Sequence, residues 1–474
     1  MQPSTETASR DRLRTNASEE KVLKRLREIV GAQHVLVGHE QVEPYAQDAV
    51  KEKFPPEAVI FPRTTAEIAL VLRLANEEQF PVTARGGGVG YTGGAVPIQG
   101  GIVLATDRMN RIKEIVVDDL YVVTEPGVTT FTLQQAVEQV GLFYPPDPAS
   151  YTQSFIGGNI AENAGGIRSA KYGVTRNYVL GLEVVTPTGE IIRTGGKTRK
   201  NVVGFDLTGL MCGSEGLLGI ISEATLRLLP MPEATATVRA TFHSMREACS
   251  CVPEFTRRRI TPVAIEVLDR NSLIAIESEF AFGLDQEAQA LLLVSVDGPA
   301  QEVEREASIV ADVLRRGGGF DLIRAANRTE EDRLWDVRRA LSPSIKKFGT
   351  LKLNEDVVVP RSRVPELIER VEEIGRRLNT FVVNFGHAGD GNIHVNFMCN
   401  REDREAVSRA RQAVGETFAV AVDLEGTISG EHGIGYVKAP YLDLALDGPT
   451  VEVMKRIKKC LDPNGILNPG KVFS

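Results

Sequence analysis

Residues 145–177 read PPDPASYTQSFIGGNIAENAGGIRSAKYGVTRN, and this stretch decides the fold. Glycine pairs at 157–158 and 165–166 leave the backbone bare, and Asn159 and Asn163 add amides that can satisfy polar edges. Residues this small let a flat ring or a pyrophosphate lie directly against the chain. Because so much glycine is costly in backbone entropy, we expect this segment to hold a ligand.

A second glycine cluster precedes it and reads RGGGVGYTGG over residues 85–94. Its glycines formally match the dinucleotide pattern GxGxxG, which requires a helix to open at the loop. A strand-like run at 101–104 follows instead, so a Rossmann interpretation fails. A hairpin without a ligand and a loop whose N–H groups approach phosphate oxygens are the remaining alternatives. The 145–177 segment favours the second, and a third glycine cluster lies at 213–219.

Length and charge restrict the class of protein. A chain of 474 residues is too long for one compact core, so we expect two or three domains. The net charge of −8 argues against a nucleic-acid-binding protein, which normally carries a basic face. The longest apolar run, 291–296, is too short to cross a bilayer and is typical of a buried strand. With no secretory signal and no disulfide framework, we expect a cytoplasmic protein whose only membrane contact would be peripheral, at the inner membrane.

Hydrophobic spacing predicts both helices and strands. After a polar leader, Ser18 is expected to open a helix that Gly31 closes. Thr64 to Glu67 form a capping box at the start of a second helix. Further elements are expected as a strand at 290–296 and helices at 301–315 and 451–461.

The segment 385–397, FGHAGDGNIHVNF, carries the clearest chemical signal. Asp390-Gly391 is a preferred two-residue hairpin turn between apolar runs. A turn there places His387 directly opposite His394 on one face, with Cβ atoms about 5 Å apart. Asn396 projects from the same face, two residues further along. Two imidazoles so placed can share one divalent cation.

The alternative is a pair of half-buried histidines that fill a sheet face, which a single histidine would favour. A third histidine favours a metal site, and it lies in the run Gly430-Glu431-His432-Gly433. The flanking glycines let the backbone direct the side chains of Glu431 and His432 inward. Two histidines and one carboxylate leave coordination positions open, as a catalytic metal requires. Zinc, manganese and iron all accept such ligands, and we expect zinc.

The motifs RGGGVGYTGGA, PPDPAS, IGGNIAENAGG, KYGVT and GSEGLLGII, in this order, resemble the FAD-binding PCMH-type domain of the vanillyl-alcohol oxidase and cresol methylhydroxylase superfamily. The later motifs resemble the branch of the glycolate oxidase catalytic subunit, D-lactate dehydrogenase and D-2-hydroxyglutarate dehydrogenase. The resemblance implies an α+β fold, with a two-subdomain PCMH-type FAD-binding domain and a substrate (cap) domain built on an antiparallel sheet with helices.

This resemblance also implies a division of the chain. Residues 1–40 would form a leader and a helix, and 41–235 the FAD-binding domain. Residues 236–435 would form the cap domain with the metal site, and 436–474 would return to the FAD-binding domain.

The resemblance implies that FAD is bound without a covalent bond, because Val89 stands where covalent members of the superfamily often carry histidine. The run from Arg85 to Gly90 should embrace the pyrophosphate. The full set of expected FAD-binding residues is Arg85, Gly86, Gly87, Gly88, Val89, Gly90, Pro146, Asp147, Gly157, Gly158, Asn159, Asn163, Gly165, Gly166, Gly173, Thr175, Gly216, Ile221 and Asn468.

By the same resemblance, His387, His394 and Glu431 match the metal ligands and His432 matches the catalytic base. Arg338 matches the arginine that binds the substrate carboxylate, for which a planar guanidinium offers a two-point grip. Without the motif, a solvated helix charge would be the better interpretation of that arginine. Further expected substrate-binding residues are Lys352, Asn396 and Ser342, the last standing where the family often has threonine.

Together these features predict an FAD-dependent dehydrogenase that oxidises a small D-2-hydroxy acid, such as D-lactate, glycolate or D-2-hydroxyglutarate, to the 2-oxo acid. In the predicted mechanism the metal lowers the hydroxyl pKa, His432 removes the proton and hydride passes from Cα to flavin N5. The electrons would then go to an iron–sulfur subunit, an electron-transfer flavoprotein or a quinone. The alternatives are a non-catalytic flavin subunit that relays electrons and a non-redox flavoenzyme that resembles alkyl-glycerone-phosphate synthase.

Overall fold

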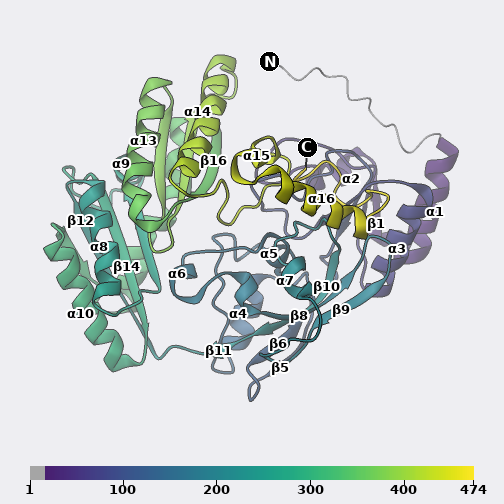
Figure 1. Ribbon diagram of the computed structural model, residues 1–474, viewed down its shortest axis with the longest axis horizontal. Coiled ribbons are helices and arrows are strands. Elements are labelled where there is room, and N and C mark those ends of the chain that lie inside the picture. The colour runs from purple at the N-terminus through teal and green to yellow at the C-terminus, as the bar shows by residue number, and fades with distance from the viewer. Residues whose placement is uncertain (1–15, 474) are drawn as a thin grey trace.

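The computed structural model describes residues 16–473, and the expected leader lies outside them apart from its last residues. Two lobes lie side by side (Figure 1). The first lobe comprises residues 16–230 together with 439–473, and the second lobe comprises residues 234–424. Among the described residues no helix is both long and apolar enough to span a membrane.

The first lobe begins with a small sheet in the order β1-β2-β4-β3, in which β2–β4 and β4–β3 are parallel and β1–β2 is antiparallel. Helix α1 contains Ser18, so this residue does not open it, whereas Gly31 follows its last residue as expected. Thr64 caps α3 as predicted, because its hydroxyl accepts from the Glu67 N–H at 3.2 Å. The elements are α1 (Asn16–Val30), β1 (Val35–Val37), α2 (His39–Val42), β2 (Ala58–Ile60), α3 (Thr65–Glu78), β3 (Val82–Arg85) and β4 (Ile102–Ala105).

A second, antiparallel sheet of the first lobe follows the order β5-β6-β10-β8-β9. Part of the glycine-rich stretch at 145–177 folds into the short helices α5 and α6, and a buried apolar cluster packs α4 and α5 against this sheet. The elements are β5 (Ile112–Val116), β6 (Tyr121–Thr124), α4 (Thr130–Glu138), β7 (Leu142–Phe143), α5 (Ile156–Glu162), α6 (Ser169–Tyr172), β8 (Val179–Val185), β9 (Ile191–Gly195), α7 (Leu207–Met211), β10 (Ile220–Arg227) and β11 (Leu229–Pro230).

The second lobe is built on one antiparallel sheet of seven strands in the order β15-β12-β14-β13-β17-β18-β16. The expected strand at 290–296 and helix at 301–315 are confirmed as β14 and α10. The elements are β12 (Ala234–Phe242), α8 (Met245–Arg257), β13 (Ala264–Asp269), α9 (Arg270–Phe280), β14 (Ala290–Gly298), α10 (Ala300–Arg316), β15 (Phe320–Arg324), α11 (Arg328–Arg339), α12 (Leu341–Ser344), β16 (Leu351–Val358), α13 (Val364–Arg377), β17 (Phe381–His387), β18 (Asn392–Cys399) and α14 (Arg404–Asp423).

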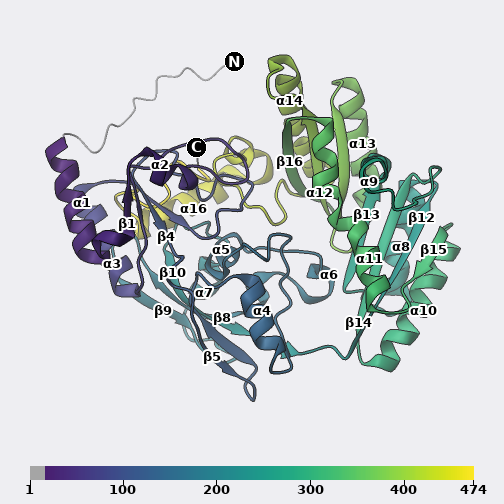
Figure 2. The ribbon, with the colours of Figure 1, turned by 180° about the vertical axis from the view of Figure 1, so that it is seen from behind.

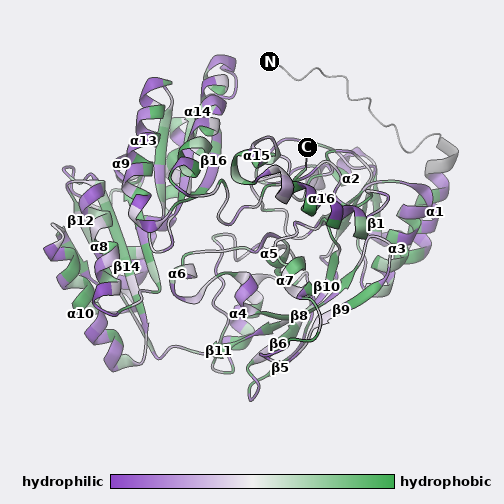
Figure 3. Cartoon of the chain, viewed as in Figure 1, coloured by the Kyte–Doolittle hydropathy of each residue, from purple (hydrophilic) through white to green (hydrophobic). Residues whose placement is uncertain are grey.

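Helices cover both faces of the seven-stranded sheet. On one face α8, α10, α13 and α14 bury a large apolar cluster, and on the other face α9, α11 and α12 bury a smaller one. Figure 3 shows apolar residues along these strands and mixed colours on the covering helices. Side chains alternate between the faces of a strand, so Glu266, His387 and His394 share the face of the smaller cluster.

The end of the chain returns to the first lobe, as Figure 2 shows from behind. The predicted helix at 451–461 is confirmed as the last helix of the chain. Beyond it the backbone joins the edge of the small sheet, where the Val82 N–H donates to the Ile466 carbonyl at 2.8 Å and the Asn468 N–H to the Val82 carbonyl at 2.9 Å. The elements of this segment are α15 (Leu442–Ala445) and α16 (Gly448–Leu461).

Candidate active site

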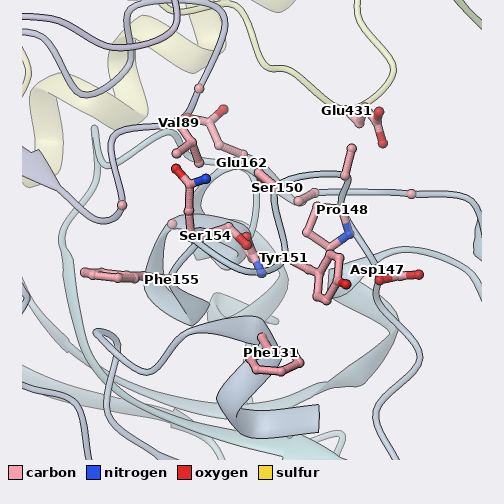
Figure 4. Close-up of a pocket in the computed structure, with 18 of the residues that line it drawn as sticks. Val89, Phe131, Asp147, Pro148, Ser150, Tyr151, Ser154, Phe155, Glu162 and Glu431 are labelled. Atoms are coloured by element: carbon pink, nitrogen blue, oxygen red, sulfur yellow. The ribbon is translucent and has the colours of Figure 1, made fainter. Parts of the chain in front are cut away.

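A cavity of 1260 Å³ lies between the two lobes. The glycine-rich loops of the first lobe line one part of its wall, and the histidines of the β17–β18 hairpin line another. Figure 4 shows Val89 and Glu431, from distant parts of the chain, beside the same pocket. Residues from both lobes therefore face one cavity.

Two positions of the loop at 85–90 favour glycine, Gly87 and Gly88. A Cβ on Gly87 would lie 2.2 Å from the Gln153 carbonyl oxygen, and one on Gly88, whose φ is +65°, would lie 2.1 Å from the Arg85 guanidinium. The Arg85 Nη1 donates to the Ala95 carbonyl at 3.2 Å and so helps to fold the loop around itself. These glycines bring bare backbone to the cavity wall.

Most of the expected FAD-binding residues line this cavity. They are Arg85 to Gly90, Asp147, Gly157, Gly158, Asn159, Gly166, Gly216, Ile221 and Asn468.

Pro146, Asn163, Gly165, Gly173 and Thr175 are not among the lining residues. Asn163 ends α5 at a φ of +55°, and its side chain accepts from the Arg176 N–H at 2.9 Å. Thr175 donates to the Ala164 carbonyl at 2.8 Å, which closes the loop behind the wall. These polar groups hold the shape of the wall from behind it.

The hairpin that carries the histidines differs from the sequence expectation. Residues 388–391 form a four-residue loop, and His387 pairs with Asn392 while His394 pairs with Phe385. The predicted two-residue turn at Asp390-Gly391 is therefore wrong, and so is the direct opposition of the two histidines. They still share a face, because the shift moves the pairing by an even number of positions.

The diagonal offset nevertheless brings the rings together. The His387 and His394 ring centroids lie 5.3 Å apart at 85°. Glu431 Oε1 lies 3.8 Å from His387 Nε2 and 3.4 Å from His394 Nε2. One nitrogen or oxygen atom from each of these three residues lies within 4.8 Å of the others, so the set could hold one metal ion.

Glu266, which sequence reasoning missed, orients this group from the neighbouring strand β13. Its carboxylate bonds to His387 Nδ1 and accepts from Arg338 Nε at 2.6 Å. Burial alone would raise the pKa of Glu266, but the positive charges of His387 and Arg338 outweigh it and hold the pKa at about 2. A charged residue in the buried run Ala264–Asp269 was the sequence signal that could have found it.

The electrostatics of Glu431 and His394 favour a cation between them. Burial would raise the pKa of Glu431, but its interaction with His387, whose Nε2 lies 3.8 Å from Oε1, lowers the pKa to about 2. Burial lowers the pKa of His394 to about 3, so this imidazole is neutral and its lone pair is free to bind. An anionic carboxylate beside a neutral imidazole is a typical ligand set for a divalent cation.

His432 lies against the cavity between two aromatic rings. Its ring stacks on the rings of Tyr91 and His394, with centroid separations of 4.9 Å and 5.5 Å. Asp356 Oδ1 lies 3.3 Å from His432 Nδ1, and Asp356 Oδ2 accepts the N–H groups of the Gly430 to His432 backbone at 2.9, 2.6 and 3.0 Å. Burial lowers the pKa of His432 despite the attraction of Asp356. Asp356 and Tyr91, also missed by sequence reasoning, fix the imidazole in place.

The predicted substrate-binding residues take two different positions. Arg338, Ser342 and Lys352 line the cavity, and the Arg338 guanidinium lies 4.6 Å from the centre of the Phe385 ring. Asn396 is not among the lining residues; its side chain donates to the Val383 carbonyl and accepts from Asn354, which does line the cavity. Asn396 and Asn354 are cross-strand partners on one face of the sheet, and the hydrogen bond that Asn354 donates to Asn396 supports the cavity wall from beside it.

The comparisons with known proteins agree with this architecture. Residues 56–195 match the family described as "FAD binding domain", and residues 231–472 match "FAD linked oxidases, C-terminal domain". The chain belongs to the FAD-linked oxidases. It is therefore an FAD-linked oxidoreductase, and the expected resemblance is confirmed.

Similar curated proteins cover nearly the whole chain. The glycolate oxidase subunit GlcD of Bacillus subtilis is 41% identical over 91% of this chain and 92% of its own length. The D-lactate dehydrogenase of Anaerostipes hadrus is 35% identical over 94% and 95% of the two chains. The D-lactate dehydrogenase of Archaeoglobus fulgidus is 36% identical over 91% of this chain and 94% of its own length.

Solved structures share the fold at low sequence identity. A substrate-bound p-cresol methylhydroxylase superposes with a TM-score of 0.81 at 18% identity, covering 97% of each chain. The 4-ethylphenol oxidase of Gulosibacter chungangensis gives 0.78 at 20% identity, over 97% of this chain and 98% of its own. The predicted α+β fold of the PCMH type is confirmed.

Proposed function

We propose that this enzyme oxidises a small D-2-hydroxy acid to the corresponding 2-oxo acid, with glycolate, D-lactate and D-2-hydroxyglutarate as the candidate substrates. The observation that carries the proposal is the His387, His394, Glu431 and His432 cluster in the same cavity as the glycine-rich loops. The names of the similar curated proteins, a glycolate oxidase subunit and D-lactate dehydrogenases, support it. On this proposal residues 41–235 with 436–474 bind FAD, and residues 236–435 bind the substrate.

FAD would lie against the glycine-rich wall, which the predicted FAD-binding residues form or shape from behind. The fit rests on Gly87, where a Cβ would clash with the Gln153 carbonyl oxygen, and on Gly88, whose φ of +65° favours glycine, so both positions leave the backbone uncovered. When bound, FAD supplies the acceptor for the hydrogen and the electron pair that leave Cα. We propose that it is held without a covalent bond, because Val89 has no nucleophilic side chain.

A divalent cation, for which we propose zinc, would be held by His387, His394 and Glu431. The fit rests on the three donor atoms within 4.8 Å of one another and on Glu266, which bonds the other ring nitrogen of His387. Manganese and iron suit the same ligands. When bound, such an ion lowers the pKa of a coordinated hydroxyl.

The remaining roles fall to side chains at the cavity. Arg338 binds the substrate carboxylate, with Ser342 and Lys352 beside it, while Asn396 holds Asn354. His432 takes the hydroxyl proton, for which its neutral form is required. Burial lowers the pKa of this imidazole, and so favours the neutral form at neutral pH.

The reduced flavin must be reoxidised by a partner. We propose an acceptor other than a nicotinamide, either an iron–sulfur subunit, an electron-transfer flavoprotein or a quinone, in the cytoplasm or at the inner membrane. A flavin subunit that only relays electrons would have no use for the His/Glu cluster. The fold is shared with alkyldihydroxyacetonephosphate synthase, at a TM-score of 0.76, but at 18% identity this likeness concerns the fold alone.

The experiment that tests the proposal is anaerobic titration of the FAD-loaded enzyme with each 2-hydroxy acid. Bleaching of the flavin absorption band by glycolate, or by the D-isomer of lactate or 2-hydroxyglutarate, without dithionite, is the expected result. A flavin that stays oxidised with all three acids would contradict the proposed reaction. Turnover with an artificial dye but not with NAD⁺ would support the assignment of the acceptor class.

A further inference from the structure

The loop between β9 and α7 presents apolar side chains to solvent. It spans residues 196–206 and reads GKTRKNVVGFD. Val202, Val203 and Phe205 are 97%, 89% and 95% exposed, the largest exposures among the large hydrophobic residues that the structure describes. Single exposed apolar residues are ordinary, but three on one short loop indicate a surface that a partner covers.

The loop is ordered by its own hydrogen bonds. The Asn201 side chain accepts from the Val203 N–H at 3.0 Å, and the Leu207 N–H donates to the Phe205 carbonyl at 2.8 Å. Asp206 caps α7 by accepting from the Gly209 N–H at 2.8 Å. These local bonds shape the turns of the loop, and its three apolar side chains lie in solvent.

Basic residues flank the apolar ones. Lys197, Arg199 and Lys200 are all exposed, and Lys197 forms an ion pair with Glu114. Within the described residues, the side chains of Arg199 and Lys200 form no hydrogen bond or ion pair, and only the Lys200 carbonyl accepts, from the Thr198 hydroxyl at 3.2 Å. Two free cations beside an apolar tip, on a chain whose net charge is −8, indicate an anionic partner.

The loop is separate from the candidate active site, because none of residues 196–206 lines the cavity. Its function can therefore be tested without disturbing the reaction. The inference does not depend on the substrate proposed above.

We propose that this loop binds the surface of a bilayer that contains anionic lipids. Val202, Val203 and Phe205 would enter the headgroup region, while Arg199 and Lys200 would contact lipid phosphates. A protein partner fits less well, because a stable interface needs about 800 Å² from each side with matched shapes, which one protruding loop does not offer. A fluid bilayer accepts three apolar side chains without shape complementarity.

The test is sedimentation of the FAD-loaded full chain with vesicles. One set contains phosphatidylcholine alone, and the other contains about one third phosphatidylglycerol. We expect binding to the anionic vesicles, weak binding to the neutral ones, and loss of binding in about 1 M salt, where the screening length falls to about 3 Å.

Two loop variants separate the apolar and charged contributions. Val202→Ser with Phe205→Ser should weaken binding to anionic vesicles at least about tenfold, since these side chains lose the apolar environment. Arg199→Gln with Lys200→Gln should weaken it about 25-fold, at about fivefold per charge. The matched control is Val117→Ser with Val453→Ser, which changes two exposed valines elsewhere and should bind like the wild type.

Dye-linked activity in solution should stay unchanged in every variant, which also shows that each one folds. Failure of the wild-type protein to sediment with anionic vesicles would overturn the proposal. Loop variants that bind these vesicles as well as the wild type would also overturn it. If the wild type does not bind vesicles, and the loop variants elute from size-exclusion chromatography at a different volume from the wild type, the loop is a protein interface and the bilayer proposal is wrong.

Discussion

His432 combines a buried imidazole, two stacked rings and a carboxylate 3.3 Å from Nδ1. For His432→Ala we predict that metal, FAD and substrate still bind, while flavin reduction slows by about 10²–10⁴-fold, the usual contribution of a positioned base. Stopped-flow measurement of flavin bleaching gives the rate, and an equilibrium titration gives the substrate affinity. A variant that reduces flavin at the wild-type rate would remove His432 from the mechanism.

Lys352 leads to a prediction about how KM depends on pH. Burial, with the nearby charges of Lys346 and Lys51, lowers the pKa of Lys352 to about 8. This lysine is therefore charged below that pH and neutral above it, so its attraction for the substrate carboxylate is lost as pH rises through about 8. We expect KM to rise by about 10- to 100-fold over this range, the usual worth of a charged hydrogen bond.

Lys352→Arg is the matched control, because an arginine keeps its charge throughout the range. Its KM should stay nearly flat where that of the wild type rises. Identical pH profiles for the two proteins would show that Lys352 does not bind the carboxylate.

Val89 lines the cavity, and its side chain offers no nucleophile for a covalent bond to flavin. Acid precipitation should therefore release all of the FAD into the supernatant, which absorbance of the separated fractions measures. A washed pellet that stays yellow would contradict non-covalent binding.

At the scale of elements, the β17–β18 hairpin sets the place of the two histidines. Gly391 in its loop has a φ of +87°, and a Cβ there would lie 2.0 Å from the Val359 carbonyl oxygen. We predict that Gly391→Ala destabilises the folded state by at least about 1–3 kcal/mol, from backbone strain and the clash together. Thermal unfolding measures the loss as a lower midpoint.

Gly448→Ala is the control for that variant. Gly448 begins α16, and a Cβ there would meet no atom within 4 Å, so alanine should be neutral or slightly stabilising. Equal midpoints for the two variants would show that the hairpin loop is less constrained than its geometry indicates.

At the scale of the molecule, the cavity depends on how the two lobes are joined. Asp297 of β14 accepts from the Tyr172 hydroxyl at 2.8 Å and forms an ion pair with Lys171, which links α6 of the first lobe to the second. The proposed FAD site lies on the first lobe, whereas His387 and His394 of the proposed metal site lie on the second lobe and Glu431 on the segment that joins residue 424 to residue 439. Loss of the metal ion should therefore leave FAD bound, and loss of FAD should leave the metal ion bound.

Chelation tests this separation. Prolonged treatment with a chelator should abolish substrate-driven flavin reduction while FAD stays bound, and His394→Ala should act in the same way because it removes a ligand of the same ion. Elemental analysis measures the metal, and the flavin spectrum measures the FAD. Full activity in protein shown to be free of metal would leave His387 and His394 as structural residues.

The sequence by itself determined which residue types lie on the two sides of the cavity, the glycine-rich side and the side with the histidines. Glycine clusters at 85–94 and 145–177 predicted bare backbone for a cofactor, and most of the expected residues line the cavity. The histidines of 385–397 and the Glu431-His432 pair were also found, because residue type and local spacing are enough to mark them. The strand and helix at 290–315 followed from periodicity alone.

Only the tertiary structure decided how these groups meet. The four-residue loop moved His387 out of direct register with His394, because main-chain pairing and the Gly391 conformation outweighed the turn preference of Asp390-Gly391. Glu266 and Asp356 orient the histidines from strands far away in the chain, and local sequence holds no information about which strands become neighbours. Long-range strand pairing and the packing of two lobes place them, and these depend on the whole chain at once.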